Sequence, residues 1–166
     1  MPLTDQIHLL LIFIAIVGSG LMAGIFYSFS VIVMRGLAEL PVPEAIRAMQ
    51  AINIVVINRW FFSVFMGTSG LSLGLLLVFT LYFRSWTSAT VIVGSLTYIV
   101  GCFWVTGTRN VPRNEKLAKI SADDKASEGL WASYLEEWTL YNHIRTGASF
   151  GAMLCYLIAA AAMLSA

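Results

Sequence analysis

The chain has 166 residues, of which 58% are hydrophobic and only 11% are charged, and its formal net charge is +1. Soluble domains usually carry about a quarter charged residues, so the composition excludes an ordinary soluble protein. The small net charge gives no indication of a nucleic-acid partner. Between the charge clusters lie apolar runs that are long enough to cross a bilayer. We therefore expect one integral membrane domain over residues 1–166.

Four apolar segments are predicted to cross the membrane as helices, because each contains about 20 predominantly apolar residues. They cover residues 7–34, 61–83, 87–108 and 144–164. Their continuous hydrophobicity excludes barrel strands, in which apolar and polar residues alternate. The first segment is longer than a bilayer requires, so it should tilt or project. No basic start precedes it, so we expect it to remain in the mature protein rather than act as a cleaved signal.

The loop between the first two spans is predicted to contain an amphipathic helix. After Pro41, polar residues recur with helical spacing among apolar ones as far as Val56. This helix either lies on the membrane surface or continues into the second span. We favour the continuation, because no helix breaker precedes Trp60.

The loop between the third and fourth spans is the most polar part of the chain. Pro112 is placed to start a short helix through Ile120, and Ser121 is a suitable N-cap for a helix that begins near Asp123 and leads into the fourth span. The predicted fold is therefore an all-α, four-helix transmembrane bundle with helical cytoplasmic extensions.

The basic residues indicate how the chain is oriented. Nine of the ten Lys and Arg residues lie in loops 35–60 and 109–143 or at Arg145, and only Arg84 lies on the other side. The positive-inside rule places these two loops in the cytoplasm and both termini outside. We expect a multi-pass protein of the cell inner (plasma) membrane, surrounded by the lipid bilayer.

Small residues recur four positions apart in three of the predicted spans. This spacing places two gaps on one helix face, so neighbouring backbones can approach closely. We expect these faces to pack the four helices together, and leave open whether some of them bind a second copy in a homo-oligomer. The pairs are Gly20 with Gly24, Gly70 with Gly74, and Gly147 with Gly151.

No metal site is expected. The two histidines, His8 and His143, are predicted on opposite sides of the membrane, and no cysteine pair has zinc-binding spacing. Cys102 and Cys155 lie inside apolar runs and are expected to be two free thiols rather than a disulfide. Phosphate-loop and dinucleotide motifs are missing from the sequence. A haem bound through His143 is left open.

A candidate site lies at the start of the fourth span. Five residues are spaced by three or four and therefore share one helix face. An aromatic stripe that leads to an amide and a guanidinium could stack on a flat aromatic ligand and bind its oxygens. The five are Trp131, Tyr134, Trp138, Asn142 and Arg145.

The same stripe has a simpler interpretation. Trp and Tyr concentrate at membrane interfaces, and Arg145 could serve only as a topology determinant. Asn142 favours a site, because an asparagine has no particular task at an interface. Asn110 and Asn114 either belong to this site or act as turn and cap residues around Pro112. His143 is either a solvated interfacial residue or a base.

Several sequence elements resemble those of the anthrone oxygenase-like integral membrane family. "NVPRNEKL" follows the third span, and "WTLYNHIRT" opens the fourth. "AGIFYSFSVIVM" and "MQAIN" are similar too, so the resemblance covers essentially the whole chain. It implies four helices. The family pattern falls on Asn110, Pro112, Asn114, Trp138, Asn142 and Arg145, with His143 beside them.

The resemblance implies oxidation of anthrones to anthraquinones by dioxygen, without metal or flavin. An anthrone anion can pass an electron to dioxygen itself, so the protein need only remove a proton and stabilise an oxyanion. We assign His143 as the base, Asn142 and Arg145 to the oxyanion, and Trp138 to ring stacking. The expected activity is a cofactor-independent monooxygenase acting on a hydrophobic aromatic substrate at the cytoplasmic interface.

The main alternative is a non-enzymatic membrane accessory protein, or one that binds lipid or quinone. A site in which the asparagines, Trp138 and Arg145 converge would favour a ligand, whereas side chains that only cap helices would favour a structural role. A small-molecule transporter is a third option, but the sequence contains no internal repeat. No charged residue is predicted at mid-membrane depth, which argues against a pump or a charge-selective channel.

Overall fold

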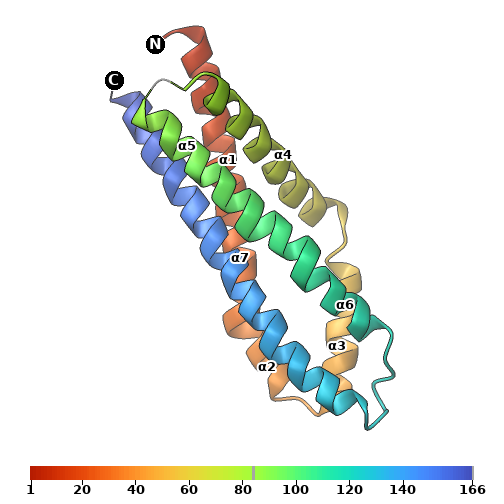
Figure 1. The fold of residues 1–166 in the computed structure, drawn as a ribbon. Helices are drawn as coiled ribbons and strands as arrows, with labels where there is room; N and C mark the ends of the chain where they lie inside the picture. Colours follow the sequence, from red (N-terminus) through yellow and green to blue (C-terminus); the bar gives the residue numbers. More distant parts are fainter. Residues whose placement is uncertain (84, 166) are drawn as a thin grey trace.

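The computed structural model describes residues 1–83 and 85–165, which form helices and short connections without any strand. Four helices are long and apolar enough to cross a membrane: Leu3–Ala38, Arg59–Leu81, Trp86–Ala118 and Ser127–Leu164. The predicted all-α bundle with four membrane helices is therefore confirmed (Figure 1). The protein is a multi-pass membrane protein.

Two of the long helices change between α- and π-helical geometry along their length. The first consists of α1 (Leu3–Ser28), the π-helical η1 (Phe29–Val33) and α2 (Met34–Ala38). The third consists of α5 (Trp86–Tyr98), the π-helical η2 (Ile99–Trp104) and η3 (Thr106–Asn110), and α6 (Val111–Ala118). Between and after them come α3 (Val42–Val55), α4 (Arg59–Leu81) and α7 (Ser127–Leu164).

The predicted continuation of the first-loop helix into the second span is wrong. The helix α3 ends at Val55, and α4 begins separately at Arg59. Asn58 caps the start of α4: its Oδ1 accepts hydrogen bonds from the backbone N–H groups of Trp60 at 3.0 Å and Phe61 at 3.1 Å. Asparagine is among the strongest N-caps, so Asn58 is the breaker that the sequence prediction overlooked.

The loop before the fourth span also differs in detail from the prediction. Instead of starting a separate helix, Pro112 lies where η3 passes into α6 without a break. The next helix, α7, begins at Ser127 rather than near Asp123. Ser121 is not its N-cap, because the carbonyl of Ser121 accepts a bond from the Ser127 hydroxyl at 2.7 Å. The expected long extension is nevertheless present, since α7 has 38 residues.

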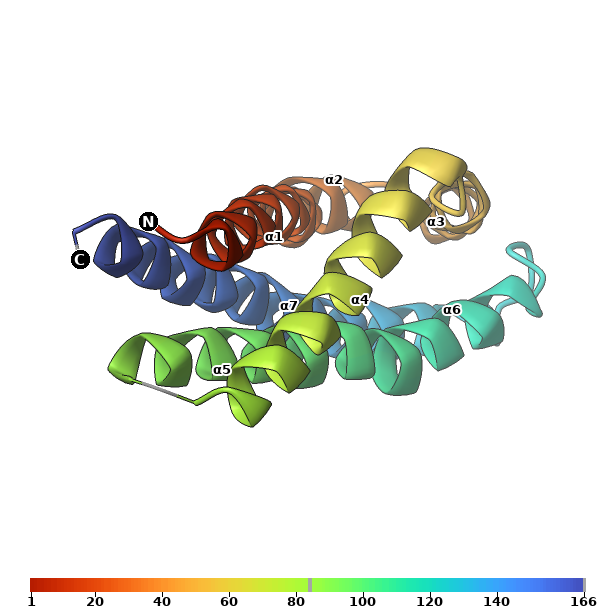
Figure 2. The same ribbon diagram turned by 90° about the horizontal axis from the view of Figure 1, so that it is seen from above.

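The side chains form two separate hydrophobic cores along the bundle. The first core lies among α1, α4, α5 and α7, and includes Ile12, Phe65 and Tyr156. The second lies among α2, α3, α6 and α7, and includes Met49 and Leu117. The crossing of α4 away from the bundle in Figure 2 leaves α3 as the fourth helix of the second core.

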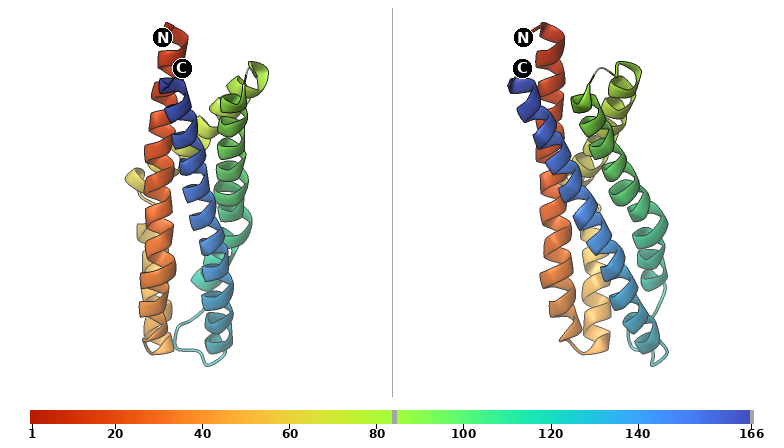
Figure 3. Two further views of the ribbon diagram at one scale, coloured as in Figure 1. Left: turned by 90° about the vertical axis from the view of Figure 1, so that its left-hand side faces the viewer. Right: turned by 60° about the vertical axis from the view of Figure 1, so that its left-hand side comes forward.

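Both termini lie at one end of the bundle, and the connections α2–α3 and α6–α7 lie at the other (Figure 3). This arrangement gathers the basic loops at one end, in agreement with the predicted topology. That this end is cytoplasmic remains a prediction from the positive-inside rule. Arg84, assigned to the opposite side, lies outside the described residues.

The glycine pairs pack the helices only in part. A Cβ atom added at Gly20 would lie 3.1 Å from the Met153 sulfur, and one at Gly151 would lie 3.8 Å from Thr97, but their partners Gly24 and Gly147, like Gly70 and Gly74, would meet nothing within 4 Å. The closest approaches occur at three other glycines, where a Cβ would collide with Thr68 at Gly18, with Cys155 at Gly94 and with Ala148 at Gly101. Glycines spaced by four residues predict a helix face without side chains, but tertiary packing decides which of these faces is buried.

Substitution of Gly94 by Leu is expected to destabilise the bundle, because its Cβ would lie 2.9 Å from the Cβ of Cys155 and 3.3 Å from the carbonyl oxygen of Ala152. Overpacking of this kind costs about 1–3 kcal/mol. Thermal unfolding in detergent should show a lower midpoint for Gly94→Leu. The matched variant Gly70→Leu, whose Cβ meets open space, should unfold like the wild type; equal midpoints for the two variants would contradict the packing.

Candidate functional site

The five-residue stripe on α7 is buried inside the bundle. Trp131, Tyr134 and Trp138 are 3%, 3% and 5% exposed, and their rings form a stacked column with centroid separations of 5.6 Å and 6.1 Å. Asn142 is 0% and Arg145 5% exposed. The predicted shared face is therefore confirmed, but the aromatic column packs inside the second core rather than forming an open interfacial platform.

Arg145 is the only buried cation among the described residues, and no carboxylate pairs with it there. It lies halfway along α7, inside the bundle, rather than at an exposed helix start. Its Nη2 donates to Oδ1 of Asn142 at 2.5 Å, and Nη1 donates weakly to the Thr106 hydroxyl at 3.4 Å. Its Nε is buried without a hydrogen-bond partner in the described part of the chain.

Two aromatic rings flank the guanidinium. The Cζ atom of Arg145 lies 4.2 Å from the ring centroid of Phe26 and 5.2 Å from that of Trp138. A desolvated cation over an aromatic face gains about 2 kcal/mol. That is less than the several kcal/mol it costs to remove an ion from water. The rings thus compensate only part of the burial of this charge.

Asn142 connects Arg145 to the first helix. Its Nδ2 donates to the carbonyl of Phe26 and to the hydroxyl of Ser30, both at 2.6 Å. With both of these donor bonds made, the amide oxygen is turned toward Arg145. Asn142 therefore joins α7 to α1 and η1, and its own Oδ1 is the main acceptor of the Arg145 guanidinium.

All three π-helical segments surround this polar layer. Ser30 lies on η1, Cys102 on η2, and Thr106 and Asn110 on η3, and each of these residues is fully or partly buried. π-Helical turns are rare and frequently occur at functional sites. The layer also lies between the two hydrophobic cores, because the Arg145 guanidinium contacts Phe26 of the first core and Trp138 of the second.

The two asparagines of the third helix support the aromatic column. The Oδ1 atom of Asn114 accepts bonds from the Tyr134 hydroxyl at 2.9 Å and from the Trp138 indole at 2.8 Å. Asn110 donates through Nδ2 to the Trp138 carbonyl at 3.2 Å, and its own Oδ1 is buried without a partner in the described residues. The structure therefore brings Asn110 and Asn114 to the stripe, and neither is merely a turn residue around Pro112.

His143 is the sequence-predicted residue that the structure does not bring into this layer. Its side chain is exposed on α7 and has no hydrogen bond or ion pair within residues 1–83 and 85–165. Its role as a base remains a prediction. Cys102 and Cys155 are both free, as expected.

Three residues of the site were missed by sequence reasoning. None of Phe26, Ser30 and Thr106 was among the residues predicted for the site. Their one sequence signal is indirect, since a buried arginine needs acceptors and aromatic faces from other helices. The sequence does not indicate which turn of the first helix supplies these acceptors and aromatic rings.

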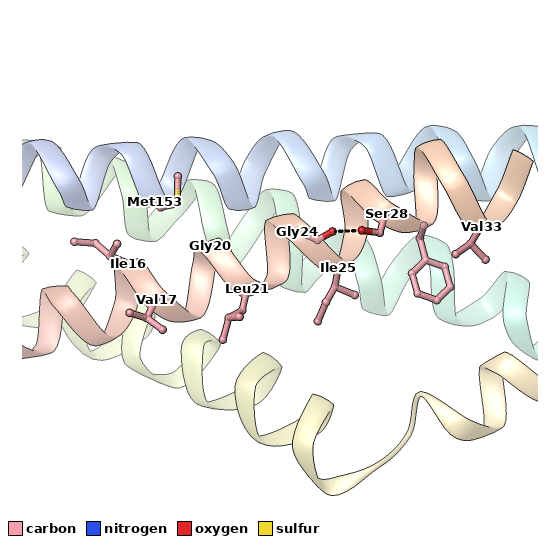
Figure 4. Close-up of a pocket in the computed structure, with 10 residues that line it drawn as sticks. Ile16, Val17, Gly20, Leu21, Gly24, Ile25, Ser28, Val33 and Met153 are labelled. Atoms are coloured by element: carbon pink, nitrogen blue, oxygen red, sulfur yellow. Dashed lines mark hydrogen bonds between the residues drawn. The ribbon is translucent and has the colours of Figure 1, made fainter.

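An apolar groove runs along the outer face of the first helix, close to the polar layer (Figure 4). Its volume is about 670 Å³, and nine of the ten residues that line it come from α1 and η1. A second groove, of about 420 Å³, lies between α1 and α4 and shares Val17 and Leu21 with the first.

The Asn142–Arg145 pair is expected to behave as one energetic unit. In Asn142→Leu the guanidinium stays buried without its main acceptor, which costs about 1–3 kcal/mol or more, because the unsatisfied donor is charged. In the double variant Asn142→Leu/Arg145→Leu no charge remains buried, so it should be more stable than Asn142→Leu alone. A double-mutant cycle from thermal or denaturant unfolding in detergent measures this coupling. Additive effects of the two substitutions would show that the pair is not coupled.

A family model described as anthrone oxygenase matches residues 59–155, which is more than half of the chain. The match includes η3, α6 and the part of α7 that carries Trp138, Asn142 and Arg145, whereas Phe26 and Ser30 lie outside it. Neither the curated proteins nor the solved structures contain a significant match. On the strength of the family match, the chain belongs to the anthrone oxygenase family.

Proposed function

We propose that the protein is a cofactor-independent monooxygenase that oxidises a hydrophobic, anthrone-type aromatic substrate at Arg145. The observation that carries this proposal is the buried guanidinium, which has aromatic rings on two sides, an unused Nε donor and no carboxylate partner among the described residues. Buried charges in proteins are normally paired, so this arrangement favours an anionic aromatic ligand.

The proposed chemistry draws its electrons from the substrate. The CH₂ group of an anthrone loses one proton, and the resulting anion has its charge largely on the oxygen. The anion passes one electron to dioxygen, and the substrate radical and superoxide combine to a peroxide anion at the former CH₂ carbon. This anion takes up one proton, equal to the one released at the start, and becomes a hydroperoxide. Loss of water from the hydroperoxide forms the second carbonyl, so anthrone and dioxygen give anthraquinone and water. No other reductant is consumed, and a haem absorption band in the purified protein would contradict this proposal.

Arg145 would act by stabilising the substrate oxyanion. A positive charge in a desolvated site lowers the pKa of a nearby acid, so the bound substrate can release its proton to solvent. Such preorganised donors usually provide the largest part of catalysis in oxyanion chemistry. Asn142 would be a positioning residue, because its amide holds the guanidinium in place.

The non-enzymatic alternative is also supported by one observation. The aromatic column already stacks on itself, and Asn114 uses its acceptor oxygen on Tyr134 and Trp138. In that interpretation the polar layer would lock the helices of an accessory or lipid- or quinone-binding protein. The two functions differ in whether removal of the Arg145 charge abolishes turnover.

Arg145→Met is expected to lower kcat/KM for anthrone oxidation by about 10²–10³-fold, as when an oxyanion donor is removed. Arg145→Lys should keep an intermediate rate, because lysine retains the charge but not the planar set of donors. Formation of anthraquinone by membranes or purified protein can be followed by absorption. Arg35→Met, which removes an exposed arginine of α2, is the matched control and should leave the rate unchanged.

The same assay decides the role of His143. With Arg145 as the main catalytic group, His143→Ala should retain activity close to that of the wild type. A general base contributes about 10²–10⁴-fold, so a loss of that size in folded His143→Ala protein would restore histidine as the base. Wild-type rates in Arg145→Met would refute the proposed function and favour the structural alternative.

A further inference from the structure

The groove on the outer face of α1 forms where two glycines contribute no side chain to the helix surface. Gly20 and Gly24 lie on its floor, and Val17, Leu21 and Ile25 project beside them (Figure 4). Its lining is almost wholly apolar, and its volume of about 670 Å³ falls in the range of about 300–1,000 Å³ that is typical of small-molecule sites. It is open toward the outside of the bundle, where a membrane helix faces lipid.

One end of the groove reaches the wall of the polar layer. Ser28, Phe29 and Val33 line this end, and the Phe29 ring lies 5.9 Å from the Trp138 ring, centroid to centroid. On the inner side of the same helical turn, Phe26 lies against the Arg145 guanidinium and Ser30 bonds to Asn142. A single turn of the first helix therefore separates the groove from the buried charge.

This turn is also where the helix changes its geometry. The π-helical η1 begins at Phe29, and the carbonyl of Phe26 accepts a bond from the Asn142 side chain. The same carbonyl also accepts the backbone N–H of Phe29, so it has both a backbone and a side-chain donor. The Phe29 ring packs against the edge of the second core and lies between the groove and the Trp138 ring.

We propose that this groove is the lateral entrance through which a flat, hydrophobic aromatic molecule with an ionisable oxygen passes from the bilayer to Arg145, with the Phe29 side chain as its gate. The inference rests on the proposed function and adds the route of the substrate. In its neutral form such a molecule fits the apolar groove. Beyond Phe29 its oxygen meets the uncompensated guanidinium, which stabilises the anion.

The charge behind the gate distinguishes this occupant from other molecules. The acyl chain of an intact phospholipid could fill the groove, but it carries no ionisable oxygen along its length to place at Arg145. A helix of a second copy could cover the groove, but at about 10–12 Å across it is too wide to pass between packed helices. Of these three occupants, the thin molecule that is apolar on its faces and acidic at its edge uses both the groove and the unpaired charge.

The test fills the groove without disturbing the bundle. A Cβ at Gly24 would meet nothing within 4 Å, so Gly24→Phe should fold normally while its ring occupies the floor of the groove. Gly70→Phe adds the same ring to α4 at a glycine that is equally open and outside both grooves. Val17→Trp blocks the groove independently from its side. Unfolding midpoints in detergent confirm that each variant is folded.

The unreactive probe is 1,8-dihydroxyanthraquinone, and its binding to protein in lipid nanodiscs is measured at equilibrium and by stopped flow. We expect Gly24→Phe and Val17→Trp to slow association by about tenfold or more, equivalent to about 1.4 kcal/mol, while Gly70→Phe matches the wild type. Phe29→Ala should speed association. With anthrone as substrate, Gly24→Phe should raise KM and leave kcat unchanged.

The outcomes separate this inference from the function on which it rests. If Gly24→Phe and Val17→Trp bind and turn over like Gly70→Phe, the groove is not the entrance, even when the wild type oxidises anthrone. If both variants impair probe binding but the wild type produces no anthraquinone, the entrance stands and the monooxygenase proposal falls. Unchanged association in Phe29→Ala would remove Phe29 as the gate.

Discussion

The bundle is organised around a buried positive charge that no carboxylate of residues 1–83 and 85–165 neutralises. Arg145 lies between two hydrophobic cores, with one strong acceptor on Asn142 and rings of Phe26 and Trp138 on two sides. Because this charge is buried, residues from three helices contact it at the same depth of the bundle, and the π-helical turns lie at that depth too. A guanidinium in this position is costly to a purely structural bundle, but it is suited to a ligand that becomes an anion when it binds.

The two cores give this charge a defined place. The first core spans the apolar parts of α1, α4, α5 and α7, and the second replaces α4 by α3. This exchange is possible because Asn58 separates α3 from α4. It leaves the outer face of α1 partly uncovered where α4 departs from the bundle, as Figure 4 shows beside the groove. An exposed groove and a buried charge thus occur on opposite sides of one helical turn.

Much of the fold could be predicted from the sequence, because span length and apolar continuity are local properties. The stripe on α7 was also predictable, since helical spacing alone places Trp131, Tyr134, Trp138, Asn142 and Arg145 on one face. Its burial was not, because interfacial and core aromatics have the same spacing. The contacts of Asn142 with Phe26 and Ser30, more than a hundred residues away, depend on tertiary packing. Four of the six paired glycines face outward for the same reason, because their spacing does not indicate which helix face is covered.

The most direct test of the account is the pKa of a phenol bound beside Arg145. Phenol and phenolate forms of 1,8-dihydroxyanthraquinone absorb at different wavelengths, so the bound ligand can be titrated in nanodiscs of wild-type protein and of Arg145→Met. The account predicts that the wild type lowers the pKa of the bound phenol by about one unit or more, which corresponds to about 1.4 kcal/mol, and that Arg145→Met abolishes this shift. Equal values in the two proteins would show that the buried guanidinium does not act on the ligand.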